Sequence, residues 1–449
     1  MMRMPEGRAF SMLIHADMPP TGDDCMPADM MKAASAMVLD ALMPLLLMMD
    51  RVAARRGDVR IGLSISPVLA DILSSDTFAR FFNSYSESRA RMISDDLLAF
   101  ARQGRGEHVA AANHWLDRLE ETMARYRSVG GGMLDEFSAY RGVELAASTA
   151  TGASLALADA ACCRLQTETG LAAFRRSAGR RAAGLAARGL AAVEVAGGTA
   201  GVLGAEGVEW VADLDGAEAA RAGNVLFLPA ARLEPERFVG HGRSYLGMEA
   251  VSVPGGMRYT TPGGAAYSRR RAEEEAAAEA EAFAASLPEG MHLFCIDAGS
   301  MFSVWHEADI WLEALLTGGS GDFAATPGQL APACTEAAEL AADSGGAVLS
   351  GAGGVAIPAS LAAEIGGGLA PGMSAASAQA SREAILIHTM AWWNHAGLAR
   401  VNREAVERHT ARMEQLTAGE ADVDDSKIAV WREETPYMDW LDRRDDSQG

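Results

Sequence analysis

Two spacings of apolar residues alternate along the first 318 residues of the chain. Short apolar runs that stop at turn-forming residues predict buried strands, and the stretches between them, apolar about every 3.6 residues, predict helices. The strands are expected near residues 11–15, 60–64, 142–146, 190–196, 208–213, 224–228 and 292–296. Because strands and helices alternate, the pattern predicts an α/β fold in which these strands lie parallel around one barrel.

The chain changes character near Gly318. Glycine, alanine and proline are frequent in the region bracketed by Gly318–Gly321 and Gly345–Gly354. Beyond this region, Ser381–Leu416 has apolar residues at helical spacing. We therefore predict two domains, a barrel over residues 1–318 and a C-terminal α-helical domain over residues 319–449.

The stretch Leu293–Leu315 carries the most chemical information. The apolar run Leu293–Ile296 stops at Asp297, and a helical pattern begins after a short loop, at Trp305. In a β/α barrel the carboxyl ends of the strands hold the reacting groups, so Asp297 is a catalytic candidate. An aspartate that ends a strand is also a common helix cap or turn former, and this alternative stays open.

A second strand end carries polar residues. The predicted strand Phe10–Ile14 is followed by His15-Ala16-Asp17. A lone histidine in this position is usually structural, but its place after a barrel strand favours a role at the mouth. We expect His15, Asp17 and Asp297 to lie together at the carboxyl-terminal rim of the barrel.

The stretch around Asp297 resembles the acid-bearing motif of glycoside hydrolase family 57, in its α-1,4-glucan branching-enzyme subgroup. Three positions depart from that motif, where Gly299, Phe302 and Ser303 replace its Glu, Gly and His. Six residues fall on matching positions: Asp297, Ala298, Trp305, Glu307, Trp311 and Leu312. The resemblance implies an incomplete, (β/α)7-type TIM barrel followed by an α-helical domain.

Other motifs of the family are matched only in part. His15 matches the first motif, whereas Asp17 replaces its second histidine. Gly152, directly after Thr149-Ala150-Thr151, replaces a substrate-contacting histidine. In a C-terminal motif Ala391 replaces an aspartate, and three residues match: Arg382, Glu383 and Trp392.

The nucleophile motif, Gly-x-Trp-Leu-Pro-Glu in the family, can be aligned in two registers. In one register Gly184-Leu-Ala-Ala-Arg-Gly189 takes its place and supplies no acid. In the other register Gly189 and Glu194 fall on the glycine and the glutamate. We favour the second register, because Leu190–Ala196 is the better strand by composition.

The resemblance implies retaining chemistry on α-1,4-glucans or other neutral oligosaccharides. Glu194 would be the nucleophile, and Asp297 the general acid and then the base. Four further residues would bind substrate: His15, Asp17, Trp305 and Trp392. Trp305 would stack on a sugar or, alternatively, be a core side chain beneath the loop. The competing interpretation is a non-catalytic glycan-binding or regulatory protein that has kept the barrel and lost its reacting groups.

Composition and charge limit the classes of partner that the protein is expected to bind. The chain has 49% hydrophobic residues, enough for a large core, and a net charge of −21, which disfavours nucleic acid and acidic membranes as partners. The five cysteines have no metal-ligand spacing and indicate a reducing, cytoplasmic compartment. No leader pattern precedes the first strand, and the apolar run Ala41–Met49 is too short to span a bilayer. Zinc, phosphate-loop and nucleophile-elbow motifs are lacking, so we expect no metal and no cofactor.

Overall fold

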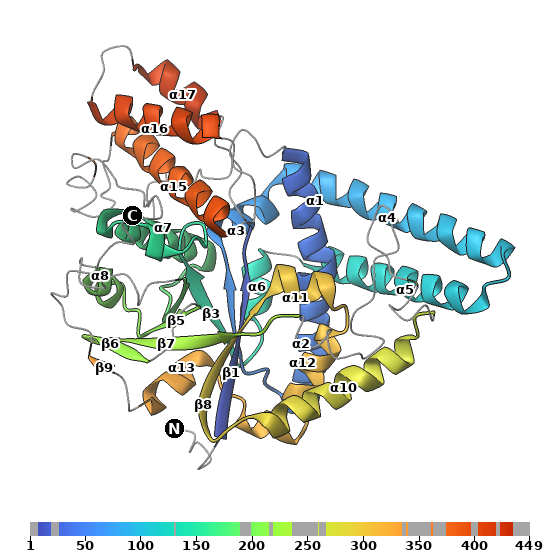
Figure 1. Cartoon of the computed structure of the whole chain (residues 1–449). Helices are drawn as coiled ribbons and strands as arrows, with labels where there is room; N and C mark the ends of the chain where they lie inside the picture. Colours follow the sequence, from blue (N-terminus) through green and yellow to red (C-terminus); the bar gives the residue numbers. More distant parts are fainter. Residues whose placement is uncertain are drawn as a thin grey trace.

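The computed structural model describes most of the barrel and three C-terminal helices (Figure 1). The described residues are 8–18, 27–129, 132–188, 199–214, 219–235, 259, 266–334, 338–339, 361, 374–396, 403–418 and 423–433.

Seven parallel strands form a closed barrel, as predicted. They pair in the order β1, β2, β3, β4, β5, β7, β8, and β8 pairs with β1 to complete the circle. A short strand β6 (Ala220–Ala222) lies antiparallel to β7, and β9 (Ala338–Glu339) lies parallel to β6. The barrel strands are β1 (Arg8–Ala16), β2 (Ile61–Ile65), β3 (Val143–Ser148), β4 (Gly184–Ala187), β5 (Trp210–Asp213), β7 (Val225–Arg232) and β8 (Gly290–Asp297).

The fourth strand lies earlier in the sequence than predicted. A barrel strand near residues 190–196 was expected, but the strand between β3 and β5 is β4, with Ser148 beside Ala186 and Leu185 beside Val211. The physical reason is packing, because a Cβ atom on Gly184 would lie only 2.0 Å from the Trp210 ring. The strand beside this tryptophan therefore has to consist of small residues. The strand preference of the residues in Leu190–Ala196 does not decide its position.

One end of the barrel is plugged. Trp210 fills the interior, and its Nε1 donates a hydrogen bond to Glu144 Oε1 over 2.9 Å. The helix α13 (Pro327–Leu330) lies across the amino-terminal end, where the Gly328 amide donates to Glu144 Oε2 over 2.7 Å. A Cβ atom on Gly62 would meet Pro327 Cγ at 2.7 Å, so the plug approaches the strand backbone closely. The amino-terminal end of the barrel is therefore closed by packed side chains.

Helices surround the barrel. Figure 1 shows α4 and α5 as a long hairpin that extends away from the strands. The helices are α1 (Pro27–Met37), the π-helix η1 (Val38–Leu42), α2 (Met43–Arg56), α3 (Pro67–Ser74), α4 (Asp76–Arg102), α5 (Gly106–Ser128), α6 (Met133–Ser138), α7 (Ala160–Ala178), α8 (Thr199–Ala205), α10 (Arg269–Ser286), α11 (Ala298–Val304) and α12 (Ala308–Thr317), with short 3-10 turns η2 (Leu155–Leu157), η4 (Gly319–Phe323) and η5 (Ala331–Ala333).

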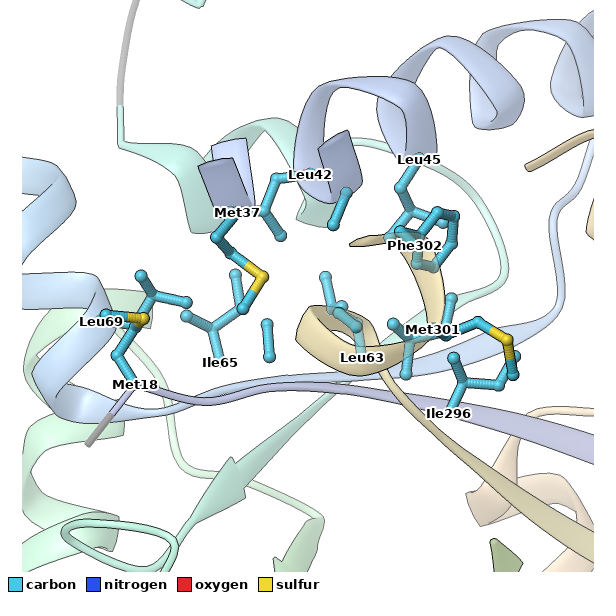
Figure 2. Packing of buried hydrophobic residues seen from close by; sticks show 14 of the residues in the cluster. Met18, Met37, Leu42, Leu45, Leu63, Ile65, Leu69, Ile296, Met301 and Phe302 are labelled. Atoms are coloured by element: carbon cyan, nitrogen blue, oxygen red, sulfur yellow. The ribbon is translucent and has the colours of Figure 1, made fainter. Parts of the chain in front are cut away.

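The first helical run is buried against the strands. Figure 2 shows Met37 and Leu42 on the side of Ile65 and Leu63, and Leu45 beside Phe302 of α11. Burying each such side chain contributes about 1.5–3 kcal/mol. The whole run Met30–Arg56 is long and apolar enough to cross a membrane by length and composition, but 72% of its most apolar window is buried inside the protein. Its apolar character is thus accounted for by core packing.

The C-terminal helices dock on one side of the barrel (Figure 1). They are α15 (Ala375–Ala396), α16 (Arg403–Ala418) and α17 (Asp425–Glu433). His388 of α15 donates from Nε2 to the Ser154 carbonyl and accepts at Nδ1 from Gln166, both over 3.0 Å. Within the helical group, Glu383 of α15 contacts the ring of His409 in α16. The helices are therefore fixed to the loop that follows β3.

The segment after Gly318 begins under the barrel. The Ala325 amide donates to the Phe10 carbonyl over 2.9 Å, and Ala338 and Glu339 pair with β6. The described residues 319–334 and 338–339 therefore pack with the strands. The division into two domains at this position stays a prediction.

Candidate functional site at the barrel mouth

Asp297 and His15 end two neighbouring strands at the same level. In the pairing of β1 with β8, His15 lies beside Asp297, and on its other side it lies beside Ser64 of β2. Asp297 also caps α11, because its Oδ1 accepts a hydrogen bond from the Ser300 amide over 2.8 Å. The cap interpretation of this aspartate is thus confirmed.

Arg188 reaches Asp297 from the opposite side of the barrel. It follows β4 directly, its side chain is about one-tenth exposed, and its guanidinium lies 3.7 Å from Asp297 Oδ2. Both carboxylate oxygens of Asp297 therefore face donors. Arg188 was not predicted as a site residue, and the only signal for it was its place at the end of the strand in the register that was not favoured.

His15 is enclosed beneath this ion pair. Its residue is 1% exposed, and its Nδ1 has no hydrogen-bond partner among the described residues. Burial and the positive charge of Arg188 lower the pKa of His15 to about 4, while Asp297 opposes this shift. The ring is therefore neutral at neutral pH, with one nitrogen available to a ligand.

Asp17 and Gly152 share one space. Gly152 has φ +65°, and a Cβ atom built on it would lie 1.8 Å from Asp17 Oδ2. Asp17 is half-buried, its Oδ1 has no partner among the described residues, and it also hydrogen-bonds with Ser66. Burial raises the pKa of Asp17 to about 7, against the opposing effects of Ser66 and Arg188. The two departures from the family motifs at these positions are thus in direct contact.

Of the other predicted site residues, one is buried in the core and two cannot be located at the mouth because their side chains lie outside the described part of the chain. Glu194, the predicted nucleophile, lies in the segment 189–198, outside the described residues. Trp392 lies on α15, and its side chain is outside the described part. Trp305 is 1% exposed and packs in the core with its ring centroid 5.8 Å from that of Trp311. The structure thus gives Trp305 the core placement, and its role in sugar stacking stays a prediction.

Asp213 is a rim residue that sequence reasoning missed. It ends β5 beside Ala187 of β4 and is 2% exposed. Its signal was the strand Trp210–Asp213 itself, since a polar residue at the carboxyl end of a barrel strand faces the mouth region. Within the described ranges, no three His, Cys, Asp or Glu side chains gather so that they could hold a metal ion.

The mouth can recognise hydroxyl groups. Asp297 and Asp17 supply carboxylate acceptors, Arg188 supplies charged donors, and His15 supplies a neutral ring nitrogen. Because each hydroxyl of a sugar both donates and accepts, a rim that combines these groups suits a neutral polyhydroxylated ligand.

Comparison with known proteins supports the same fold. No family model matches the sequence, and no curated protein matches it significantly. A GH57-type branching enzyme from Pyrococcus horikoshii superposes with a TM-score of 0.69 at 15% identity, over 95% of this chain and 94% of that one.

Two further solved structures agree. A GH57 branching enzyme from Thermococcus kodakaraensis has a TM-score of 0.71 at 15% identity and covers 96% of this chain and 95% of its own. The alpha-amylase AmyC from Thermotoga maritima has a TM-score of 0.70 at 16% identity over 97% and 99% of the two chains. The chain therefore has the (β/α)7-barrel fold of the family 57 glycoside hydrolases, as its motifs predicted.

Proposed function

We propose that this protein binds α-1,4-glucans, or closely related neutral oligosaccharides, at the barrel mouth and does not carry out retaining glycosyl transfer there. The observation that carries the proposal is the contact of Arg188 with Asp297, 3.7 Å apart, at the end of β4.

Retaining transfer needs two carboxyl groups roughly 5–5.5 Å apart, one to attack the sugar and one to donate a proton. In the register that agrees with β4, the strand ends at Ala187 and Arg188 follows it, so a guanidinium and not a carboxylate lies 3.7 Å from Asp297 at this strand end. Asp297 Oδ1 accepts from the Ser300 amide and Oδ2 lies 3.7 Å from the Arg188 guanidinium, whereas a general acid must deliver a proton. A binding role uses the same groups without a proton transfer.

The polar groups at the rim and the similar solved structures both support a glucan as the ligand. The rim combines acceptors and donors suited to sugar hydroxyls, and the similar proteins are branching enzymes and an alpha-amylase. A net charge of −21 disfavours polyanionic ligands. The four described cysteines are free, which supports a reducing compartment such as the cytoplasm.

A second candidate is retaining transfer through Glu194 and Asp297. Glu194 follows the end of β4 by seven residues, so its segment starts at the barrel mouth. This function requires the Glu194 carboxylate to reach Asp297 to about 5.5 Å.

Titration calorimetry with maltoheptaose tests the binding proposal. We expect Asp297→Asn to weaken binding about tenfold or more, because an amide presents a donor where the sugar hydroxyl now finds an acceptor. Asp95→Asn, an exposed aspartate on α4, is the matched control and should leave the affinity unchanged. Equal affinities for wild type and Asp297→Asn would place the ligand elsewhere.

A further inference from the structure

A second cleft lies in the helical layer, away from the barrel mouth. Its volume is about 460 Å³, and its lining residues come from α2, α5, α10 and α12, together with Tyr267 and Glu307. Small-molecule sites in proteins commonly have volumes of about 300–1,000 Å³. The cleft is therefore large enough for a mono- or disaccharide.

Glu307 lies buried in the wall of this cleft with one oxygen unused. The residue is 3% exposed, and its Oε1 accepts a hydrogen bond from the Tyr267 hydroxyl over 2.6 Å. Its Oε2 has no hydrogen-bond partner among the described residues. Burial raises the pKa of Glu307 to about 7, and leaving its Oε2 without a partner costs about 1–3 kcal/mol, so the site favours a ligand hydroxyl, which donates to the ionised carboxylate.

His114 offers a second unused polar atom on the same wall. Its ring stacks on Tyr267 with centroids 5.5 Å apart, and its Nδ1 has no partner among the described residues. Burial, with the charges of Arg118 and Arg269, lowers the pKa of His114 to about 3, so the ring is neutral. Two residues that contact Tyr267 thus each have one polar atom without a partner among the described residues.

The buried carboxylates Asp309 and Glu313 in the cleft are already paired with arginines. Arg51 contacts Asp309 at 3.2 Å and Glu313 at 2.5 Å, and Arg118 lies 3.5 Å from Asp309. An anion would meet the excess of carboxylates in this lining, and a cation would have to compete with the arginines that already pair with Asp309 and Glu313. A neutral ligand rich in hydroxyl groups avoids both conflicts.

We propose that this cleft is a separate binding site for a small neutral sugar, which donates a hydroxyl hydrogen bond to Glu307 Oε2. The proposal does not depend on binding at the barrel mouth, because the cleft is lined by helices of the outer layer and by two loop residues. It adds a second carbohydrate site to the chain.

Equilibrium dialysis of the full chain against radiolabelled maltose counts the sites. Ala277 of α10 lines the cleft, so Ala277→Trp should fill it and remove one bound maltose per chain relative to wild type. Ala278→Trp, the next residue on the same helix and exposed, is the matched control and should bind as wild type does. Glu307→Gln should weaken the same component at least tenfold, because it puts a donor where the ligand needs an acceptor.

Each outcome decides the proposal. Loss of one maltose in Ala277→Trp and not in Ala278→Trp, with the weakening in Glu307→Gln, supports it. Unchanged binding in Ala277→Trp, equal losses in both tryptophan variants, or unchanged binding in Glu307→Gln overturns it. If circular dichroism shows Ala277→Trp unfolded, the Glu307→Gln result decides alone. A failure of the proposal for the barrel mouth gives a different result. In that case Asp297→Asn would not change maltoheptaose binding, and the maltose bound in the cleft would still be counted.

Discussion

At the mouth of the barrel, Asp17 and Gly152 depend on each other for space. Each replaces a histidine of the family motifs, and the carboxylate of one occupies the volume that a side chain on the other would need. A side chain at position 152 therefore requires the Asp17 carboxylate to move.

Gly152→Ala tests this dependence. Gly179 has nearly the same backbone, φ +62°, with open space around it, so Gly179→Ala should cost only the roughly 1–2 kcal/mol of a left-handed alanine. Gly152→Ala should cost about 1–3 kcal/mol more, through the clash with Asp17. Urea denaturation measures both variants, and adding Asp17→Ala should remove the extra cost. Equal costs for the two glycine variants would show that Asp17 is not where we place it.

Asp17→Asn should change how stability depends on pH. The pKa of Asp17 is about 7 in the folded chain and 3.8 ordinarily, so between these values the folded state binds a proton that the unfolded state does not. Stability from this group is present at low pH and is lost as pH rises to about 7. Asn carries no charge, so the variant should match wild type near pH 4 and exceed its unfolding free energy by up to about 4 kcal/mol near pH 8.

Denaturation across this pH range checks the expectation, with the exposed Asp95→Asn as the control that follows wild type throughout. A constant difference between Asp17→Asn and wild type at all pH values would contradict the burial of this carboxylate.

Single residues at strand ends were predictable where the strand was recognised. His15, Asp17 and Asp297 follow apolar runs, and the structure brings them together. Arg188 was not predictable in the same way, because it faces Asp297 through the closure of the barrel and not through any sequence spacing. The contact of Arg188 with Asp297 can be inferred only when the position of β4 in the barrel is known.

Among the elements, β4 shows where local pattern fails. Six barrel strands were predicted near their observed positions because their apolar runs are strong. β4 consists of Gly184-Leu-Ala-Ala187, whose small residues carry little strand preference, and its place is set by the Trp210 ring of the next strand. A tertiary contact thus overrides the stronger local pattern of Leu190–Ala196.

Gly184→Ala tests the placement of β4. The added methyl group would meet Trp210 at 2.0 Å inside the barrel, so we expect a loss of about 3 kcal/mol in unfolding free energy. Gly201→Ala, in α8 with no atom within 4 Å, should instead stabilise by about 0.5–1 kcal/mol. Thermal or chemical denaturation of the two variants distinguishes them. A neutral Gly184→Ala would favour the later register for the fourth strand.

At the scale of the whole molecule, the C-terminal helices pack against the barrel, and hydrogen-bonding groups gather at the carboxyl ends of the barrel strands. The amino-terminal end is plugged by α13, and α15 is hydrogen-bonded to the loop after β3. Fold class and strand order followed from the alternating pattern, because the closure of parallel strands leaves few arrangements. The sequence left two registers open for the fourth strand, and the position of β4 agrees with the one that supplies no acid at the strand end.

The central claim is that this mouth binds glucan without cleaving or transferring it. The most direct measurement is incubation of the purified full chain with amylose, with reducing ends and iodine staining followed over time beside a Glu194→Gln variant. We predict no gain in reducing ends and no change in iodine colour for either protein, while maltoheptaose binding persists. Turnover by the wild type that is abolished in Glu194→Gln would contradict the account and restore the retaining pair of Glu194 and Asp297.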